Sequence, residues 1–277
     1  MSTMNKTYTH PVPIFQVTYD GSRYYGSQLQ PSVPTVQKSI EKALQGLTKV
    51  KAARISFSGR TDRGVHSTAQ VFSIPDGLIP PTKVVAEILN KRLEQFIRIT
   101  GFADTSTTFC PRGSAISRTY HYILRLEDCA NPFKDAYSTP VTEPIDIEKA
   151  KEVAAFFIGT HDFTHLTIKP KQQKQLVRII DNVSITLSKP KVATSERATI
   201  VCTSKAFLRR QVRNIVNLII MGGQSKITCK EIAELLKKER KDRRLKPAPP
   251  GGLYLTDIEY EENYFTQFSP FSDITEG

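Results

Sequence analysis

Segments with strand-like and helix-like patterns alternate along this chain in an order that occurs twice. In the first half, apolar alternation predicts strands, and apolar residues spaced three and four apart after Thr35 and Pro80 predict helices. The order β-α-β-β-α-β is expected over residues 14–19, 35–47, 54–57, 70–74, 80–93 and 97–102. This order is typical of a ferredoxin-like unit, in which helices cover one face of an antiparallel sheet.

The second half repeats the order with one additional helix. Strands are expected over 119–126, 177–187, 199–203 and 253–260, and helices over 146–158 and 207–221. Thr228 and Glu231 have the spacing of a capping box and begin the additional helix. We therefore predict an α+β fold of two fused ferredoxin-like halves that share a mixed, largely antiparallel sheet with helices on one face. The expected halves are 12–112 and 113–262, with flexible tails at 1–11 and 263–277.

Composition excludes several classes of protein. With 277 residues, 39% of them hydrophobic, the chain can bury a core without disulfides. No run of about 18 apolar residues and no signal-like start is present, which predicts a soluble intracellular protein. It would be cytoplasmic in a bacterium, whereas the compartment stays open for a eukaryotic source. The four cysteines form no CxxC pair, which argues against a zinc knuckle or a disulfide framework.

Positive charge is concentrated in one segment. The formal net charge is +12, and residues 205–246 hold 13 Lys/Arg and 4 Asp/Glu, so 13 − 4 = +9 falls there. Such a density favours a polyanionic partner, although a solvated helix face would have the same composition. Two long connections, 127–145 and 160–175, exceed the usual length of structureless loops. The second is either an arm that grips a polyanion through Lys169, Lys171 and Lys174 or an unimportant insertion.

The chemistry-bearing segment of the first half is the loop Gly59-Arg60-Thr61-Asp62-Arg63-Gly64-Val65-His66. Its glycines permit tight turns around a central acid. Taken alone, the pattern also fits an aspartate that only caps its own turn. Three further segments of the chain bear on this choice: RTYHY at 118–122, FLRRQVRNIV at 207–216 and PPGGLYL at 249–255.

Together these four segments resemble the TruA family of tRNA pseudouridine synthases. The resemblance extends from about Phe15 to Tyr260 and includes the segments at 19–21, 26–30, 35–37 and 159–163. It implies that the chain isomerises uridine to pseudouridine in the tRNA anticodon stem-loop, at positions 38 to 40, without a metal or organic cofactor. It also implies a homodimer and an RNA-binding cleft on the sheet face without helices.

The resemblance assigns roles to individual residues. Asp62 matches the catalytic aspartate, which acts as a nucleophile or as the base that abstracts a ribose proton; the sequence does not separate these routes. Arg213 matches the arginine beside this carboxylate, and Tyr120 the active-site tyrosine that stacks on the flipped base. Arg60 would brace the vacated stack and Leu253 would line the pocket. Simpler roles are phosphate binding or solvation for Arg213 and core packing for Tyr120 and Leu253.

Further basic residues are expected to contact the RNA. They are Arg63, Arg209 and Arg210, in addition to the three lysines of the long connection. The histidines do not form HExxH and lack partnering cysteines, so no metal site is expected.

The chain departs from the family pattern near the expected site. Family members commonly carry a Trp near the Tyr25-Gly26 pair, where this chain has Ser27 and no Trp at all. Bacterial members usually have a small residue at the position of Arg63, and a His-Met pair at Arg210-Gln211. These departures leave open which uridine is reached. Two alternatives follow: the same chemistry on other tRNA uridines or structured RNAs, and a catalytically silent RNA-binding or tRNA-folding module.

Overall fold

The computed structural model describes residues 11–47, 54–74, 79–80, 82–126, 137–168, 176–188, 196–237 and 245–265. These residues form two compact units. Unit 1 contains the described residues up to Ser117 and those from Tyr254 onward, and unit 2 contains those from Arg118 to Leu253. Residues 1–10 and 266–277, which are most of the predicted tails at 1–11 and 263–277, lie outside the described residues. So do the three lysines Lys169, Lys171 and Lys174.

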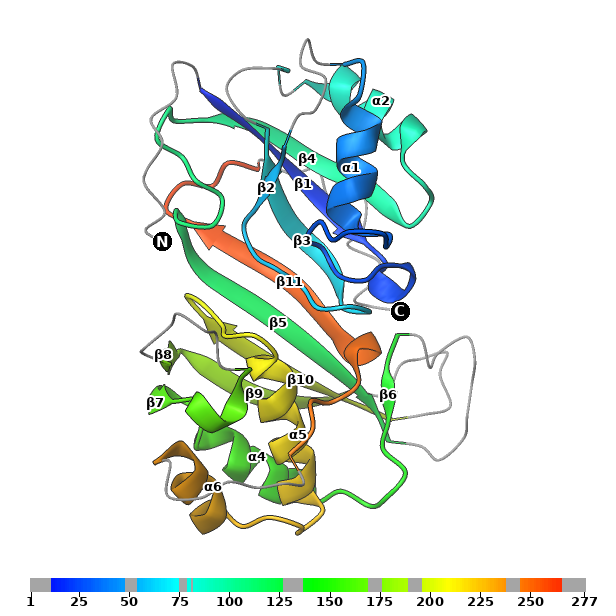
Figure 1. The fold of residues 1–277 in the computed structure, drawn as a ribbon. Coiled ribbons are helices and arrows are strands. Elements are labelled where there is room, and N and C mark those ends of the chain that lie inside the picture. The colour runs from blue at the N-terminus through cyan, green and yellow to red at the C-terminus, as the bar shows by residue number, and fades with distance from the viewer. Residues whose placement is uncertain are drawn as a thin grey trace. The chain divides into compact units, whose positions relative to one another are not determined.

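Among its described residues, unit 1 contains the helices α1 and α2, which lie against its strands in Figure 1. Its elements are β1 Val12–Tyr19, the 3-10 turn η1 Gly21–Arg23, α1 Val36–Leu44, β2 Ser56–Phe57, β3 His66–Ser73, α2 Lys83–Arg92, β4 Ile97–Thr105 and β11 Leu253–Tyr260. The strands lie in the order β4-β1-β3-β11. β1 is antiparallel to β3 and β4, whereas β11 is parallel to β3.

Strand β3 is paired at both of its ends. β2 pairs with Phe72 and Ser73 near its end, and β11 pairs with His66 and Ser67 at its start. The chain between β2 and β3 therefore has to form the loop that contains Asp62. The order β4-β1-β3-β2 is that of a ferredoxin-like unit, as the sequence pattern indicates.

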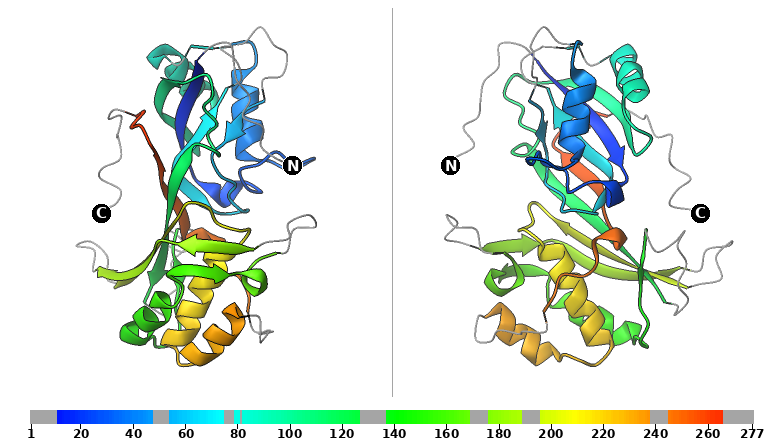
Figure 2. Two further views of the ribbon diagram at one scale, coloured as in Figure 1. Left: turned by 90° about the vertical axis from the view of Figure 1, so that its left-hand side faces the viewer. Right: turned by 45° about the vertical axis from the view of Figure 1, so that its right-hand side comes forward.

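Helices α1 and α2 pack on one cluster of buried side chains. Helix α1 begins after Thr35 as predicted, whereas α2 begins at Lys83 and not at Pro80. Thr35 and Thr82 cap the helices by accepting hydrogen bonds from Lys38 N–H and Val85 N–H. Figure 2 shows α1 from the side, along the face of β1 and β3. Each fully buried side chain of this cluster contributes about 1.5–3 kcal/mol through removal from water. The cluster includes Phe15, Val17, Val36, Ile40, Leu44, Phe72, Leu89 and Ile97.

Unit 2 contains three helices among its described residues. Its elements are β5 Ala115–Arg125, which begins in unit 1, β6 Thr139–Pro140, α4 Ile147–Ala155, β7 Gly159–Asp162, η2 Thr164–Leu166, β8 Val177–Ile180, β9 Asn182–Ser188, β10 Arg197–Ser204, α5 Gln211–Gly223, α6 Cys229–Leu236 and η3 Pro250–Gly252. The strand order β5-β10-β9 is antiparallel throughout and corresponds to β1-β3-β2 of unit 1.

Two expectations about unit 2 are wrong. The single strand expected over 177–187 is two strands, because the chain breaks at Asp181, where the N–H donates to Thr203 O at 2.9 Å. β8 consequently pairs with β7, and residues 160–166, expected to lack regular structure, form most of β7 and all of η2. β7 has only four polar or small residues, so it carries no apolar alternation that a sequence pattern could reveal.

The helices of unit 2 pack closely through glycines. Cβ atoms built at Gly222 and Gly223 would come within 2.5 Å of the side chains of Val153 and Ile145, so α5 approaches α4 only because these positions lack Cβ atoms. The Thr228/Glu231 capping box at the start of α6 is confirmed. None of the helices in the described ranges has both the length and the apolar character that a membrane crossing requires.

The predicted α+β class and the largely antiparallel strand pairing are confirmed. The halves 12–112 and 113–262 stay a prediction as folding domains. The compact units begin and end elsewhere, because β11 pairs with β3 and belongs to unit 1.

Candidate functional site

Asp62 lies half-buried in the loop that joins β2 to β3. The main chain reverses directly after it, since Val65 N–H donates to Asp62 O at 3.2 Å. Gly64 has φ +78°, a left-handed conformation that glycine adopts without steric cost. Arg60 and Arg63, on either side of the Thr61-Asp62 pair, are exposed. The loop therefore presents one carboxylate between two guanidinium groups.

The buried amide of Gln70 holds the start of this loop. Its Oε1 accepts from Ser58 Oγ at 2.8 Å and from Gly59 N–H at 3.3 Å. Its Nε2 donates to Gly59 O at 3.0 Å and to the Tyr19 hydroxyl at 3.4 Å. Because Gln70 is 0% exposed, loss of any one of these bonds would leave a buried polar group without its partner.

Thr61, the residue before Asp62, is bound through both its side chain and its main chain. Its hydroxyl lies 2.8 Å from the Tyr19 hydroxyl. Its N–H donates to Ser27 Oγ at 2.9 Å, and Ser27 N–H donates back to Thr61 O at 3.2 Å. All three residues are buried, and a bond of this kind contributes about 0.5–1.5 kcal/mol. These bonds fix the direction in which the main chain enters Asp62.

Two glycines allow the preceding segment to lie directly against the loop. A Cβ at Gly21 would come within 2.0 Å of Val65 O, and one at Gly26 within 2.8 Å of Thr61 O. Gly21 N–H also donates to His66 Nδ1 at 3.1 Å. The His66 ring is buried and stacks on Tyr254 with 4.8 Å between ring centroids. His66 thus joins two strands and the loop of unit 1.

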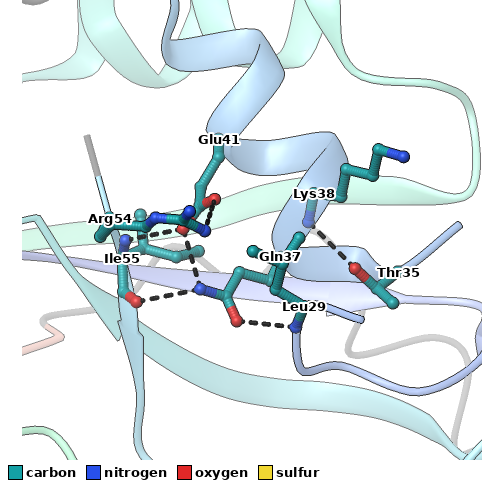
Figure 3. A network of polar contacts seen from close by, with 7 residues as sticks. All are labelled: Leu29, Thr35, Gln37, Lys38, Glu41, Arg54 and Ile55. Atoms are coloured by element: carbon teal, nitrogen blue, oxygen red, sulfur yellow. Dashed lines mark hydrogen bonds and ion pairs between the residues drawn. The ribbon is translucent and has the colours of Figure 1, made fainter. Parts of the chain in front are cut away.

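Helix α1 supports the Gly26-Ser27 pair from behind. Its first N–H groups, at Val36 and Gln37, donate to Gly26 O at 3.3 Å and to Ser27 O at 2.9 Å. Figure 3 shows how the Gln37 side chain continues this connection. Gln37 Oε1 accepts from Leu29 N–H at 2.9 Å, and its Nε2 donates to Glu41 Oε1 at 2.8 Å. Glu41 in turn accepts from the N–H of Ile55 at 3.2 Å, just before β2.

Electrostatic and burial effects distinguish the ionisable groups around the loop. Burial raises the pKa of Tyr19 to about 12, so its hydroxyl keeps its proton at neutral pH. Partial burial and, second, the charge of the nearby Arg112 lower the pKa of Arg60. Arg60 and Arg112 are both exposed, so this part of unit 1 attracts anions.

Tyr120 and Arg213 are positioned within unit 2. Tyr120 lies on β5, is 7% exposed and meets the Phe207 ring edge to face at 5.3 Å between centroids. Arg213 lies in the first turn of α5 and is half-buried. Its Nε donates to Ala248 O at 2.7 Å, and Ala248 N–H donates to Arg213 O at 3.0 Å. The arginine therefore fixes the segment that precedes β11.

A second tyrosine anchors the same segment further along. The Tyr122 hydroxyl donates to Pro249 O at 2.8 Å and lies 2.6 Å from Thr139 Oγ1. Burial raises the pKa of Tyr122 to about 12, while the Thr139 bond and the charge of Arg213 act in the opposite direction. A Cβ at Gly252 would come within 2.8 Å of Thr139 Oγ1 and 2.9 Å of Ile123 O. Only glycine fits there.

The turn before α5 presents two arginines. Arg209 and Arg210 are exposed, and Arg210 adopts the left-handed conformation with φ 63°. The fully buried side chain of Gln211 closes the turn by accepting from Leu208 N–H at 2.7 Å. Thr167 Oγ1 donates to Arg209 O at 2.9 Å. Gln211, a departure from the family pattern, thus shapes the turn that exposes both arginines.

Comparison with known proteins shows to which family this chain belongs. A family model described as tRNA pseudouridine synthase matches residues 16–111 and 153–261, which include the Asp62 loop and α5. This chain belongs to the tRNA pseudouridine synthase family. The prediction of a pseudouridine-forming isomerase is confirmed by this membership.

Curated relatives match over nearly their whole length. A tRNA pseudouridine synthase A of Oceanobacillus iheyensis is 33% identical over 248 residues, which cover 89% of this chain and 96% of the relative. The proteins of that name from Listeria welshimeri and Idiomarina loihiensis are 32% and 31% identical, covering 88% and 94% of this chain and 97% of each relative. A solved chain entitled "Crystal Structure of a Cbf5-Nop10-Gar1 Complex" aligns with 76% of this chain and 45% of its own length, at TM-score 0.32 and 12% identity.

The structure of this family member distributes the predicted site residues over both units. Asp62, Arg60 and Arg63 share one loop of unit 1. The others lie in unit 2: Tyr120 on β5, Arg209 and Arg210 before α5, Arg213 on α5, and Leu253 at the start of β11. Leu253 is 5% exposed, and Arg213 binds Ala248. Their roles in the reaction stay predictions.

Sequence reasoning missed the residues that hold the Asp62 loop of this family member. The sequence pattern includes Tyr19 only as part of a family segment, and Ser27 only as a departure from the family pattern. It includes Gln70 only as a residue of an expected strand. Gln70 directly precedes the apolar pair Val71-Phe72 of the expected strand, and a polar residue at that position was the available signal. Among the described residues no group of three or more His, Cys, Asp or Glu side chains is arranged to hold a metal. His161 instead lies 2.9 Å from Ile158 O through its Nε2.

Proposed function

We propose that this chain converts uridine to pseudouridine at positions 38 to 40 of the tRNA anticodon stem-loop, with Asp62 as the catalytic carboxylate. The supporting observation is the family match over residues 16–111, within which Asp62 stands on a loop held by buried hydrogen bonds. A catalytic group needs such a fixed position, since small displacements reduce the rate strongly.

The reaction breaks the bond between N1 and C1′ of the uridine and forms a bond between C5 and C1′. The C5 proton leaves and N1 gains a proton, so the product is an isomer and no redox step is required. Asp62 attacks the ribose as a nucleophile or abstracts a ribose proton to give a glycal. The target base must first leave its stack, which costs a few kcal/mol. In this proposal Arg60 braces the vacated position.

The resemblance assigns Tyr120 and Arg213 to the same reaction, Tyr120 for stacking and proton transfer and Arg213 as the positive charge that keeps the carboxylate ionised. Leu253 contributes an apolar wall of the pocket. The exposed guanidinium groups of Arg63, Arg209 and Arg210 support the proposal that these residues contact RNA phosphates. Lys169, Lys171 and Lys174 are proposed for the same role from the sequence alone.

We infer further that two copies of the chain present the tRNA together and that they act in the cytoplasm. The support is the resemblance to bacterial synthases over 88–94% of this chain. Light scattering of the purified protein tests the first inference, which a monomer at working concentration contradicts.

The decisive experiment compares the chain with Asp62→Ala on unmodified tRNA transcripts that carry uridines at 38, 39 and 40. Pseudouridine is mapped by carbodiimide adducts, without added metal or nucleotide. We expect product at these positions, lost by at least about 10³-fold in Asp62→Ala while RNA affinity is retained. Asp104→Ala, which removes an exposed carboxylate of β4, is the matched control and should remain active. Tight binding without product on any RNA would instead indicate a tRNA-folding module.

A further inference from the structure

Two exposed residues form a stacked pair next to the catalytic loop. The Arg63 Cζ atom lies 4.1 Å from the centroid of the Tyr25 ring. Tyr25 is 40% exposed, and Arg63 is also exposed. Arg63 directly follows Asp62 in the chain, and it departs from the small residue usual in bacterial members. The pair is therefore a feature of this chain, and it lies next to the loop at which a substrate of Asp62 has to bind.

Both partners are fixed by their main chains before any ligand binds. Tyr25 N–H donates to Pro34 O at 2.9 Å, and Tyr25 O accepts from Gln30 Nε2 at 2.6 Å. On the other side, Gly64 N–H donates to Tyr24 O at 3.4 Å, which joins the turn after Arg63 to the residue before Tyr25. The main chain that carries the pair therefore need not rearrange when a third group stacks on it.

The chemistry of the pair fits a nucleic-acid strand. A guanidinium that covers an aromatic ring with one face offers its other face to a nucleobase, and its N–H groups bind phosphate oxygens at the edge. Lysine provides the same charge but no planar face. The net charge of +12 favours a polyanion over a neutral peptide as the occupant.

We propose that the Tyr25–Arg63 pair is the platform on which the nucleotide adjacent to the target uridine stacks, and that it helps to select among the uridines of the anticodon stem-loop. This inference rests on the proposed function. The platform binds substrate but does not touch the reacting bond, because the buried bonds to Thr61 set the direction of Asp62. Its loss should raise KM and change the preference among positions while kcat stays constant.

The test separates the contributions of the Arg63 charge, the planar face of the Arg63 guanidinium and the Tyr25 ring. Arg63→Lys keeps the charge and removes the planar face, Tyr25→Leu removes the ring, and Tyr25→Phe keeps it. KM and kcat are measured on transcripts that carry one uridine at 38, 39 or 40. We expect Arg63→Lys and Tyr25→Leu each to raise KM about 10-fold for at least one position. The double variant should resemble either single variant, because both remove one platform. Tyr25→Phe keeps the ring and should raise KM less than Tyr25→Leu does.

A second arginine over a ring provides the matched control. Arg23 lies over the Phe96 ring, with 5.2 Å between its Cζ atom and the ring centroid, and it is exposed. Arg23→Lys should leave KM unchanged; an equal rise in KM would overturn the platform. The proposal also fails if Arg63→Lys binds and reacts as the unchanged chain does, or if kcat falls while KM stays constant.

RNA affinity keeps this test independent of catalysis. The same substitutions are made in an Asp62→Ala background, and binding of the anticodon stem-loop is measured by fluorescence anisotropy. A loss of affinity of about 10-fold on Arg63→Lys supports the platform. Unchanged affinity overturns it, even when the parent chain forms pseudouridine. A parent chain that forms no pseudouridine contradicts the proposed function alone.

Discussion

In unit 1 the loop around Asp62 is held in part by side chains that bond to one another, whereas in unit 2 the Tyr122 and Arg213 side chains hold the segment 248–253 by bonds to its main-chain oxygens. Both segments use a buried tyrosine and a glycine. Tyr19 bonds to the Thr61 side chain, and Tyr122 bonds to Pro249 O as well as to Thr139. Arg213 adds a bond to Ala248 O.

This difference concerns which substitutions each segment tolerates. A main-chain oxygen is present whatever residue stands at 248 or 249, so the unit 2 segment depends on its anchors alone. The unit 1 loop depends in addition on bonds in which both partners are side chains, since Tyr19 bonds to the Thr61 hydroxyl and Gln70 to the Ser58 hydroxyl. The geometry at Asp62 should therefore be the more sensitive of the two to single-atom changes.

The largest expected effect comes from filling the glycine contacts. Gly21→Ala places a Cβ within 2.0 Å of Val65 O, whereas Gly252→Ala places one within 2.8 Å of Thr139 Oγ1. We expect the free energy of unfolding to fall by about 3 kcal/mol for Gly21→Ala and by about 1–2 kcal/mol for Gly252→Ala, because the overlap with a main-chain oxygen is much deeper at Gly21 than at Gly252, where Ile123 O is 2.9 Å away. Urea unfolding measures both.

A matched glycine controls for the substitution itself. The Cβ of Gly113→Ala would meet its nearest atoms, those of Cys110, at 3.6 Å, an ordinary contact. Its free energy of unfolding should stay within about 0.5 kcal/mol of the parent chain. Equal losses for Gly21→Ala and Gly252→Ala would show that the depth of the overlap does not set the loss of stability.

Removal of single hydroxyl groups gives the next largest effect. Tyr19→Phe breaks the bond to Thr61, so kcat should fall about 10-fold with KM unchanged, and the free energy of unfolding should fall by about 1–2 kcal/mol. Tyr122→Phe should cost similar stability and affect kcat less, because Arg213 still holds Ala248. Multiple-turnover kinetics with saturating tRNA measure kcat.

Tyr24→Phe is the control in the same unit. The Tyr24 hydroxyl donates to Glu94 Oε2 at 3.4 Å and not to the loop. This variant should keep the kcat of the parent chain. If Tyr24→Phe and Tyr19→Phe lower kcat equally, the hydroxyl of Tyr19 acts on general stability and not on the position of Asp62.

The smallest expected effect is a loss of folding stability at high pH, to which one tyrosine in each unit contributes. Burial raises the pKa of Tyr19 and of Tyr122 from 10.0 to about 12. Between these values the unfolded chain releases the proton and the folded chain keeps it, so stability is complete below pH 10 and falls as the pH rises toward 12. At pH 11 each tyrosine should account for about 1 kcal/mol of the loss.

Urea unfolding at pH 9 and pH 11 measures this loss. Tyr19→Phe and Tyr122→Phe should each reduce the difference between the two pH values by about 1 kcal/mol. A difference that stays unchanged in either variant would mean that the tyrosine ionises equally in the folded and unfolded chain.

Much of the fold follows from local patterns. Strand β11 was predicted with the bounds that the structure has, and the capping box at Thr228 and Glu231 begins α6 as expected. Helix α5 begins at Gln211 and not at Phe207, because the left-handed Arg210 and the Gln211 side chain close a turn first. Such a turn is set by contacts rather than by periodicity, so its position could not be derived from spacing.

The sequence by itself determined the α+β class, the family and the candidate residues Asp62, Tyr120 and Arg213, because apolar periodicity and short motifs are local properties. Only the tertiary structure decided how Asp62 is held, since Tyr19, Ser27 and Gln70 meet Thr61 and Ser58 from separate elements. It alone placed Arg63 over Tyr25. These contacts join residues between 12 and 42 positions apart in the chain, and only packing brings such residues together.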